Sequence, residues 1–264
     1  MSNSGGLFDR LGSNYKGETT ANNRADSTTD SRGGGFSNTS FGYQEEENRG
    51  FSNEQELSSF VKTTYQLFAA SLLAGSAGAW LGTSIAPFIK SIYWLLVIVE
   101  LGLIFGLNFV RNKPGINLIV LFAFTFISGL TLAPLLVSIL SLKGGGAIVT
   151  NAFLMTSVAF GGLSLFAMQT KRDFTSIGKI LFIVLIVVVV GSIANIFLHS
   201  PILQLIIAMV SAILFSVFIL YDTQNIINGG YDSAVSAAAS LYLNFLNLFT
   251  SLLQILGILG SSDD

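Results

Sequence analysis

The stretch ILFIVLIVVVVGSIANIFLH covers residues 180–199, and ILQLIIAMVSAILFSVFIL follows at residues 202–220, after Ser200-Pro201. Each run is close to the roughly 20 apolar residues that an α-helix needs to cross the hydrocarbon of a bilayer. Both runs are too long and too uniformly apolar for the alternating pattern of a membrane β-strand. The stretch therefore predicts two consecutive transmembrane helices joined by a tight turn.

The same pattern continues on both sides of this pair. We predict seven spans, at residues 65–86, 88–110, 116–140, 147–168, 180–199, 202–220 and 234–259. Short breaks rich in Gly, Pro, Lys and Arg separate them. The expected fold class is an all-α membrane protein with a seven-transmembrane helix bundle, which occupies residues 57–264.

Residues 1–56 have a different composition from the rest of the chain. They hold nine of the 15 acidic residues and five of the 13 basic ones, and they show no apolar periodicity. Such a segment does not bury enough apolar surface to offset the entropy lost on ordering. We predict a disordered N-terminal tail, which is either a spacer or a docking segment for a partner.

Composition excludes several classes of function. The chain is 51% hydrophobic and 11% charged, against about 25% charged in soluble domains. A net charge of −2 offers no basic surface for nucleic acid. The absence of cysteine and the single histidine, His199, argue against thiolate catalysis and a resident metal. We expect the lipid bilayer as the surroundings, no nucleic-acid partner and no cofactor.

Lysine and arginine residues near the span ends predict the orientation of the chain. An N-terminus in the cytoplasm puts two cations outside, Lys90 and Lys143. The same orientation puts seven inside, namely Arg49, Lys62, Arg111, Lys113, Lys171, Arg172 and Lys179. We therefore predict a cytoplasmic N-terminus, an external C-terminus, and a cytoplasmic connection between spans six and seven.

Two charged residues of the second span share a face. Glu100 lies near mid-membrane, where a carboxylate should face the bundle interior and be protonated, partnered or hydrated. Arg111 follows about three helical turns later, roughly 16 Å along the axis. The two residues place an acid and a cation on one stripe that ends at the cytoplasmic mouth. The alternative is structural, with Glu100 bonded to hydroxyls and Arg111 at the head groups.

The last span carries a polar stripe that cannot face lipid. Its members are spaced 4, 3, 4 and 3 residues apart: Ser240, Asn244, Asn247, Ser251 and Gln254. They either bond to other helices or line a hydrated path, and we expect the path. Asp222, at the end of the sixth predicted span, either terminates its helix or acts as a gate at the cytoplasmic mouth. We expect the gate.

Several ordered segments identify a family. They are SGLTLAPLL (128–136), FGGLSLFAMQTKRDFTSIGK (160–179), NIF (195–197), YDTQ (221–224) and LYLNFLNLFTSLLQILG (241–257). Together they resemble the bacterial branch of the transmembrane Bax inhibitor motif family, over roughly residues 57–260. The resemblance implies a bundle whose last helix is central and surrounded by the other six. It also implies a pH-sensitive calcium leak in the inner membrane of a bacterium.

The resemblance also implies roles for individual residues. The family's YDTQ aspartate, here Asp222, shares a proton with an aspartate of the last helix, at the position of Asn244 in this chain. A basic residue of span two, here Arg111, pairs with Asp222, and Glu100 resembles the family's buried acid of the same span. Asn244 keeps the shape of an aspartate but not its charge. The chain therefore departs from the family pattern in the second acid.

Two function classes remain. The first is a gated leak for calcium or other cations, with Asp222 as a transient calcium site. Its gate and path would be formed by Asp222, Asn244, Arg111, Glu100 and Asn247. The second is a regulator of a membrane-bound AAA protease, a role that the resemblance also implies and that needs no ion path.

Enzymatic activity is not expected. Tyr221-Asp222 and Gly229-Gly230-Tyr231-Asp232 only echo the motifs of intramembrane aspartyl proteases, because the second motif has the wrong order. Ser164 and His199 do not form a dyad, since the predicted topology places them toward opposite faces of the membrane.

Overall fold

A computed structural model describes residues 54–261, which are helical and contain no β-strand. The elements are α2 (Glu54–Ser84), α3 (Ala86–Ser91), α4 (Tyr93–Val110), α5 (Ile116–Leu140), α6 (Gly145–Gln169), the 3-10 turn η1 (Thr175–Ile177), α7 (Gly178–Leu198), α8 (Pro201–Ile227) and α9 (Ala234–Ser261). The predicted tail lies outside the described residues except for its last three, 54–56, which begin α2.

Seven of these helices are long and apolar enough to span a membrane, so the seven-span prediction is confirmed for the described part of the chain. Large apolar side chains cover the outside of the bundle, including Ile98, Phe105 and Phe109 of α4 and many residues of α7. A continuous apolar surface of this extent is incompatible with water and suits lipid. The protein is a multi-pass membrane protein.

Three helix boundaries differ from the prediction. Helix α2 begins at Glu54, eleven residues before the predicted start of the first span at residue 65. The second predicted span is divided, because the backbone turns at Ile92 between α3 and α4. Helix α8 continues past the predicted end at Leu220 to Ile227, so Asp222 does not terminate its helix. The extra residues stay helical because Asp222, Thr223, Gln224 and Ile226 are buried against other parts of the bundle.

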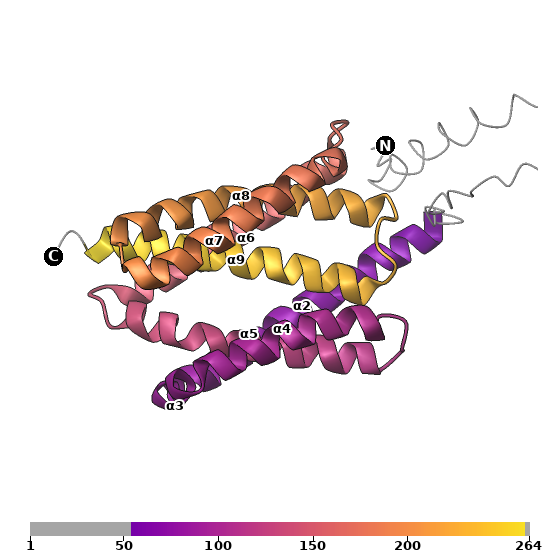
Figure 1. Ribbon diagram of the computed structural model, residues 1–264. Coiled ribbons are helices and arrows are strands. Elements are labelled where there is room, and N and C mark those ends of the chain that lie inside the picture. Colours follow the sequence, from indigo (N-terminus) through magenta and orange to yellow (C-terminus); the bar gives the residue numbers. More distant parts are fainter. Residues whose placement is uncertain (1–53, 262–264) are drawn as a thin grey trace, which may run out of the picture.

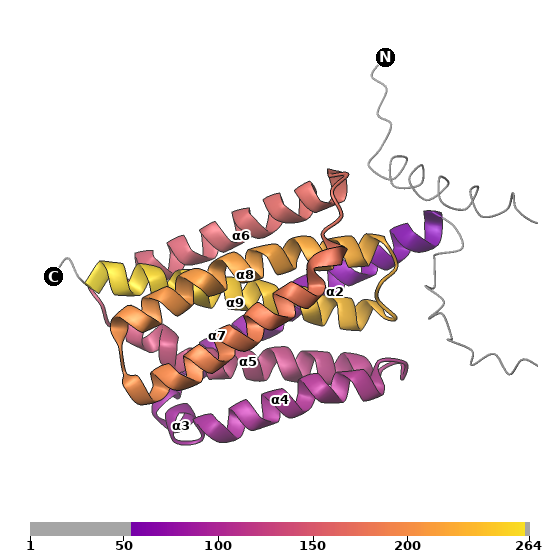
Figure 2. The same cartoon turned by 45° about the horizontal axis from the view of Figure 1, so that its top comes forward.

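Successive spans run in opposite directions, which gives the bundle two distinct ends (Figures 1 and 2). The start of α2 lies at one end, together with the α4–α5, α6–α7 and α8–α9 connections. We call this the N-side end. The last residues of α9 lie at the opposite end, with α3 and the α5–α6 and α7–α8 connections. This arrangement fits the predicted topology, while the side of the membrane that each end faces stays a prediction.

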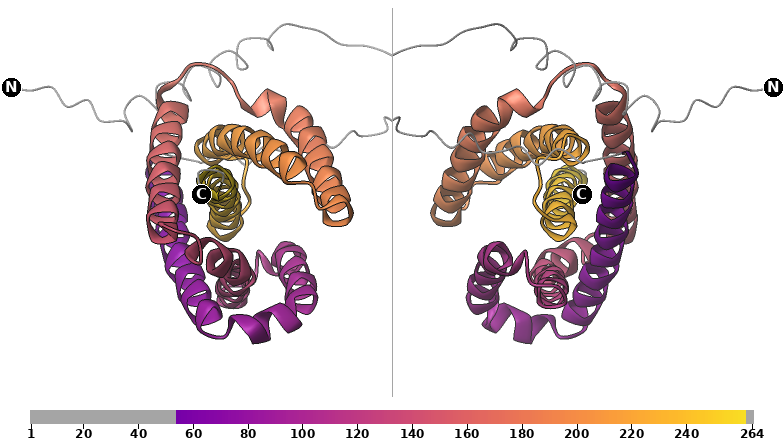
Figure 3. Two further views of the ribbon diagram at one scale, coloured as in Figure 1. Left: turned by 90° about the vertical axis from the view of Figure 1, so that its left-hand side faces the viewer. Right: turned by 90° about the vertical axis from the view of Figure 1, so that its right-hand side faces the viewer.

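Helix α9 packs against α8, α6, α2 and α5, whereas α4 packs mainly on α5 and α7 on α8. End-on views show α9 on the inner side of α8 and α6 (Figure 3). These contacts do not extend to all six other spans, so the fully surrounded last helix also stays a prediction. Phe68, Phe160 and Phe245 join α2, α6 and α9, with ring centroids 4.6 to 5.9 Å apart.

Helices α2 and α5 pack closely because glycines remove side chains from their contact. A Cβ on Gly78 of α2 would lie 2.0 Å from the carbonyl oxygen of Phe126, and one on Gly129 of α5 would lie 2.0 Å from that of Gly75. Small residues of this kind let membrane helices approach without a hydrophobic driving force between them.

Candidate functional site

Asp222 lies in the last two turns of α8 and is 3% exposed. Three side chains donate hydrogen bonds to its carboxylate. The Tyr231 hydroxyl donates to Oδ1 at 2.7 Å, and the Asn244 amide donates to Oδ2 at 2.6 Å. The Ser240 hydroxyl also donates to Oδ2. A buried carboxylate is tolerated when donors satisfy it in this way, so these contacts fasten α9 and the preceding connection onto α8.

The α8–α9 connection, residues 228–233, is shaped to bring these donors to Asp222. Gly229 adopts a positive φ of 76°, and the Gly230 amide donates to the Asn225 carbonyl at 2.7 Å, which reverses the chain. Ser233 then accepts a hydrogen bond from the Ser236 amide at 3.1 Å at the start of α9. Ser240 and Asn244 are one helical turn apart on α9, so both reach the same carboxylate.

Adjacent residues of this connection point in opposite directions. Tyr231 turns inward to Asp222, while Asp232 pairs with Arg111 of α4, with 2.6 Å between Nη1 and Oδ2. Arg111 and Asp232 have side chains 43% and 51% exposed. The resemblance implied a pair between Arg111 and Asp222. The structure pairs Arg111 with Asp232 instead, because Asp222 is buried beneath the connection and Arg111 caps α4 at the surface.

Tyr231 is a permanent donor at this site. Burial, and then the negative charge of Asp222, raises the pKa of the Tyr231 phenol well above its ordinary value. The phenol therefore keeps its proton throughout the physiological pH range and continues to donate to the carboxylate.

Glu100 belongs to a different cluster. The Thr131 hydroxyl of α5 donates to its carboxylate at 2.9 Å, which fits the structural alternative for this residue. The Ser128 hydroxyl, one turn earlier on α5, lies 2.5 Å from the hydroxyl of Tyr242 on α9. Tyr242 also donates to the Thr125 carbonyl at 3.0 Å. The second acid of the predicted path is thus bonded between α4 and α5, apart from the Asp222 site.

Comparison with known proteins defines the family. A family model described as inhibitor of apoptosis-promoting Bax1 matches residues 57–261. The chain belongs to the Bax inhibitor family. The match runs from the first turns of α2 to the end of α9, so it includes both polar clusters.

Three relatives illustrate the range of this family. An uncharacterised protein of Campylobacter jejuni is 56% identical over 205 residues, which is 76% of this chain and 89% of the relative. A membrane protein of Vibrio cholerae is 36% identical over 210 residues, 79% and 93% of the two chains. The modulator of FtsH protease YccA of Escherichia coli K12 is 35% identical over 198 residues, 75% and 89% of the two chains.

The polar stripe of this Bax inhibitor family member is divided among several partners. Ser240 and Asn244 bond to Asp222. Asn247 donates to the Leu243 carbonyl of its own helix at 2.8 Å, and Ser251 donates to the Asn247 carbonyl at 2.6 Å. Each stripe residue therefore has a protein partner, the fifth being described next. Ser240, Asn244 and Gln254 bond to another helix, whereas Asn247 and Ser251 bond to their own helix, so bonding between helices accounts for part of the stripe. A hydrated path stays a prediction.

The far end of the stripe joins a network of amides that the sequence analysis missed. Gln204 of α8 donates to Gln254 of α9 and accepts from Asn195 of α7 at 2.7 Å. Asn195 also accepts from the Ser200 amide at 3.1 Å, across the α7–α8 turn. In the sequence Asn195 is only part of a family segment, and the signal that it matters is an amide within a long apolar run.

A second missed residue is Gln224 of the YDTQ segment, which is 5% exposed. Its amide donates to the Arg172 carbonyl at 2.7 Å and its oxygen accepts from the Phe174 amide at 2.6 Å. Gln224 thereby fixes the α6–α7 connection to α8. Lys171 and Arg172 are exposed on this fixed connection at the N-side end.

Among residues 54–261, no three His, Cys, Asp or Glu side chains lie close enough to hold a metal ion together. Calcium takes six to eight oxygen ligands, usually with several carboxylates. Asp222 offers one carboxylate, and both of its oxygens already accept hydrogen bonds. The transient calcium site at Asp222 therefore stays a prediction.

Proposed function

We propose that this protein modulates a membrane-bound AAA protease of the FtsH type by direct contact. The observation that carries the proposal is the similarity to YccA, a modulator of FtsH protease, over three quarters of this chain. The relative and this chain also align over 198 residues, which is most of the length of the relative.

The internal bonding of the bundle supports a role by contact. Three donors hold Asp222, Thr131 holds Glu100, and Gln204 joins Gln254 near the opposite end. These bonds hold the helices to one another within the membrane, and pre-organised elements present a binding surface at little entropic cost.

The α6–α7 connection is the surface that we assign to the protease. Gln224 fixes its backbone at two points, so the charges of Lys171 and Arg172 are presented in a defined place. In the predicted orientation this connection is cytoplasmic. Positively charged, exposed side chains there suit an acidic patch on a cytoplasmic partner domain, because complementary charge speeds association and selects the partner.

Proteoliposomes that contain an FtsH-type protease and a membrane-protein substrate test this proposal. Addition of this protein should slow degradation, and the double variant Lys171→Glu/Arg172→Glu should lose most of the effect. Lys90→Glu reverses an exposed charge at the opposite end and is the matched control, which should act like the parent. Unchanged degradation with the parent protein, together with no cross-linking to the protease, would contradict the proposal.

A second candidate function is the pH-sensitive cation leak. It is supported by a buried carboxylate beneath a connection that two separate contacts hold in place, Tyr231 on Asp222 and Asp232 on Arg111. For the leak to open, the 228–233 connection would have to break both of these contacts.

Calcium flux into dye-loaded liposomes tests the leak. Glu100→Gln keeps an oxygen acceptor for Thr131, so it should lower flux while leaving the melting temperature nearly unchanged. Flux through the parent no greater than through empty liposomes would remove this candidate, and equal flux in parent and variant would return Glu100 to a packing role.

A further inference from the structure

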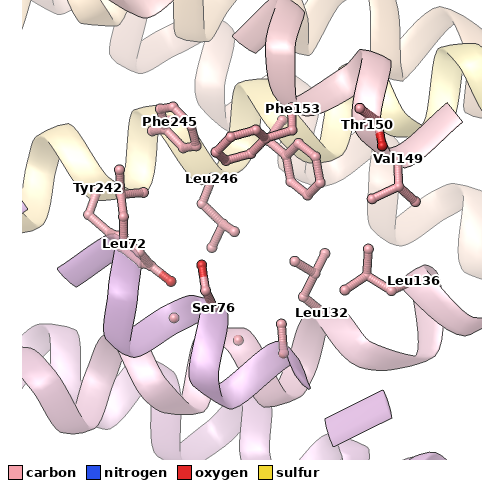
Figure 4. A pocket seen from close by; sticks show the side chains of 14 residues that line it. Leu72, Ser76, Leu132, Leu136, Val149, Thr150, Phe153, Tyr242, Phe245 and Leu246 are labelled. Atoms are coloured by element: carbon pink, nitrogen blue, oxygen red, sulfur yellow. The ribbon is translucent and has the colours of Figure 1, made fainter. Parts of the chain in front are cut away.

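A cavity of about 350 Å³ lies between α2, α5, α6 and α9. Leu246 reaches into it from α9 toward Ser76 of α2 and Leu132 of α5, with Phe153 of α6 beside it (Figure 4). Tyr242 lines the same space, and none of the lining residues carries a charge. An apolar space of this kind excludes water unless several polar groups can bind it.

The cavity lies at the depth of the hydrocarbon. Its lining residues on α2 fall between 72 and 79, within a helix that runs over Glu54–Ser84. Those on α5 fall between 129 and 136 of Ile116–Leu140, and those on α9 between 242 and 249 of Ala234–Ser261. The lining lies at least about one turn inside each helix, with Leu136 near the end of α5, Ala79 near the end of α2 and Val149 near the start of α6. Because none of the lining residues is charged, the space suits an acyl chain and not a polar lipid head group.

The cavity opens sideways, between α2 and α6. Ser76 of α2 and Thr150 of α6 both line it and are exposed on the outside of the bundle, and Phe153 beside them is 48% exposed. The neighbouring outer surface is apolar and lipid-facing, with Leu73 and Trp80 on α2 and Leu154 on α6. The mouth is thus continuous with the surface that the bilayer covers.

Size distinguishes the candidate occupants. A transmembrane helix is about 10–12 Å across, so even a few of its turns exceed a space of about 350 Å³. A methylene group takes about the volume of a water molecule, roughly 30 Å³, so the cavity holds on the order of ten methylenes of one chain. We propose that the cavity is a lateral binding site for the acyl chain of a membrane lipid.

This site is separate from the proposed contact with a protease, and its position suggests an effect on α9. Tyr242 and Leu246 face the cavity, whereas Asn244, between them in sequence, lies on the other side of α9 and bonds to Asp222. A bound chain therefore supports α9 from the side opposite to Asp222.

Photoreactive lipids test the site. The protein is reconstituted in vesicles of phosphatidylcholine and phosphatidylethanolamine that contain a phospholipid with a mid-chain diazirine, and labelled residues are mapped by mass spectrometry. Label is expected on Leu132, Tyr242 and Leu246, which line the cavity. Ser76→Phe places a ring in the mouth and should lower this label at least several-fold.

The matched control is Ala77→Phe, which adds the same ring to the adjacent exposed position of α2 outside the lining. It should leave cavity labelling at the parent level. Surface labelling of Leu73 and the melting temperature should be the same in all three proteins. No label at the cavity positions, equal label in Ser76→Phe, or cross-links there to a second polypeptide in place of lipid would overturn the proposal.

Discussion

Asn244→Asp is the sharpest perturbation of the Asp222 site. The Asn244 amide now donates to Asp222 over 2.6 Å, and the substitution replaces this donor with a second carboxylate of the same shape. Two unit charges about 4 Å apart repel by about 4 kcal/mol at an effective dielectric constant of 20. At neutral pH the variant should therefore lose about this much unfolding free energy, or bind one proton between its two carboxylates to avoid the loss.

The pH dependence of the variant has a defined sign. Repulsion makes the pair bind a proton more tightly when folded than when unfolded. The stability of the variant should therefore approach that of the parent at low pH and fall as the pH rises and that proton is lost. The assay is thermal unfolding in detergent between pH 5 and 8. Asn244→Ala is the control, since it removes the same donor without adding a charge, and its loss of stability should depend less on pH.

The exchanged pair tests whether the two positions meet. Asp222→Asn combined with Asn244→Asp restores one carboxylate and one amide, so the double variant should recover most of the stability lost in Asn244→Asp. In the exchanged protein the amide oxygen at position 222 still accepts from Tyr231, while the amide nitrogen takes the place of Oδ2 beside Ser240 and position 244. Additive losses in the double variant, or a single variant that is as stable as the parent across the pH range, would refute the contact on which this reasoning rests.

Three further tests by thermal or chemical unfolding have defined outcomes. Tyr231→Phe should cost about 1.5–3 kcal/mol, the value of a hydrogen bond to a charged group. The pKa of the Tyr231 phenol is raised in the folded protein, so the hydrogen bond contributes to the free energy of unfolding at every pH below about 10 and is lost only above that pH. An unchanged unfolding midpoint of Tyr231→Phe at pH 7 would contradict this prediction. Gly129→Ala should cost about 1–3 kcal/mol or more by overpacking against α2, whereas Gly102→Ala, with nothing within 4 Å of the added methyl group, should not destabilise. A double-mutant cycle on Arg111 and Asp232 should give only about 0.2–1 kcal/mol, decreasing with salt, because the ion pair is half exposed; a coupling of several kcal/mol would show that it is buried.

Hydropathy predicts the bounds of a span well where Gly, Pro or charged residues flank it. Helix α5 matches its predicted bounds because Pro114-Gly115 precedes it and Lys143-Gly144 follows it closely. The end of α8 was missed because Asp222, Thr223 and Gln224 read as polar, although each is buried with a partner. The break at Ile92 was missed because the second span was predicted to begin at residue 88, although the polar residues Lys90 and Ser91 directly precede the break.

The candidate site was predictable in part. Resemblance to the family placed Asn244 opposite Asp222, and the structure joins the two. The partner of Arg111 was not predictable, since it depends on how the glycine turn at Gly229 directs Asp232 outward. The sequence predicted a hydroxyl as the partner of Glu100 but not which one, and the structure shows that it belongs to Thr131. The choice depends on how α4 and α5 are aligned along their axes, which the local sequence does not specify.

One measurement addresses the central proposal most directly. An FtsH-type protease, a membrane substrate and this protein are reconstituted in the same vesicles with a calcium-sensitive dye inside, and degradation and flux are recorded together. We predict slower degradation that depends on Lys171 and Arg172 and that occurs without calcium entry. Calcium entry at an unchanged rate of degradation would contradict it and assign the protein to the leak.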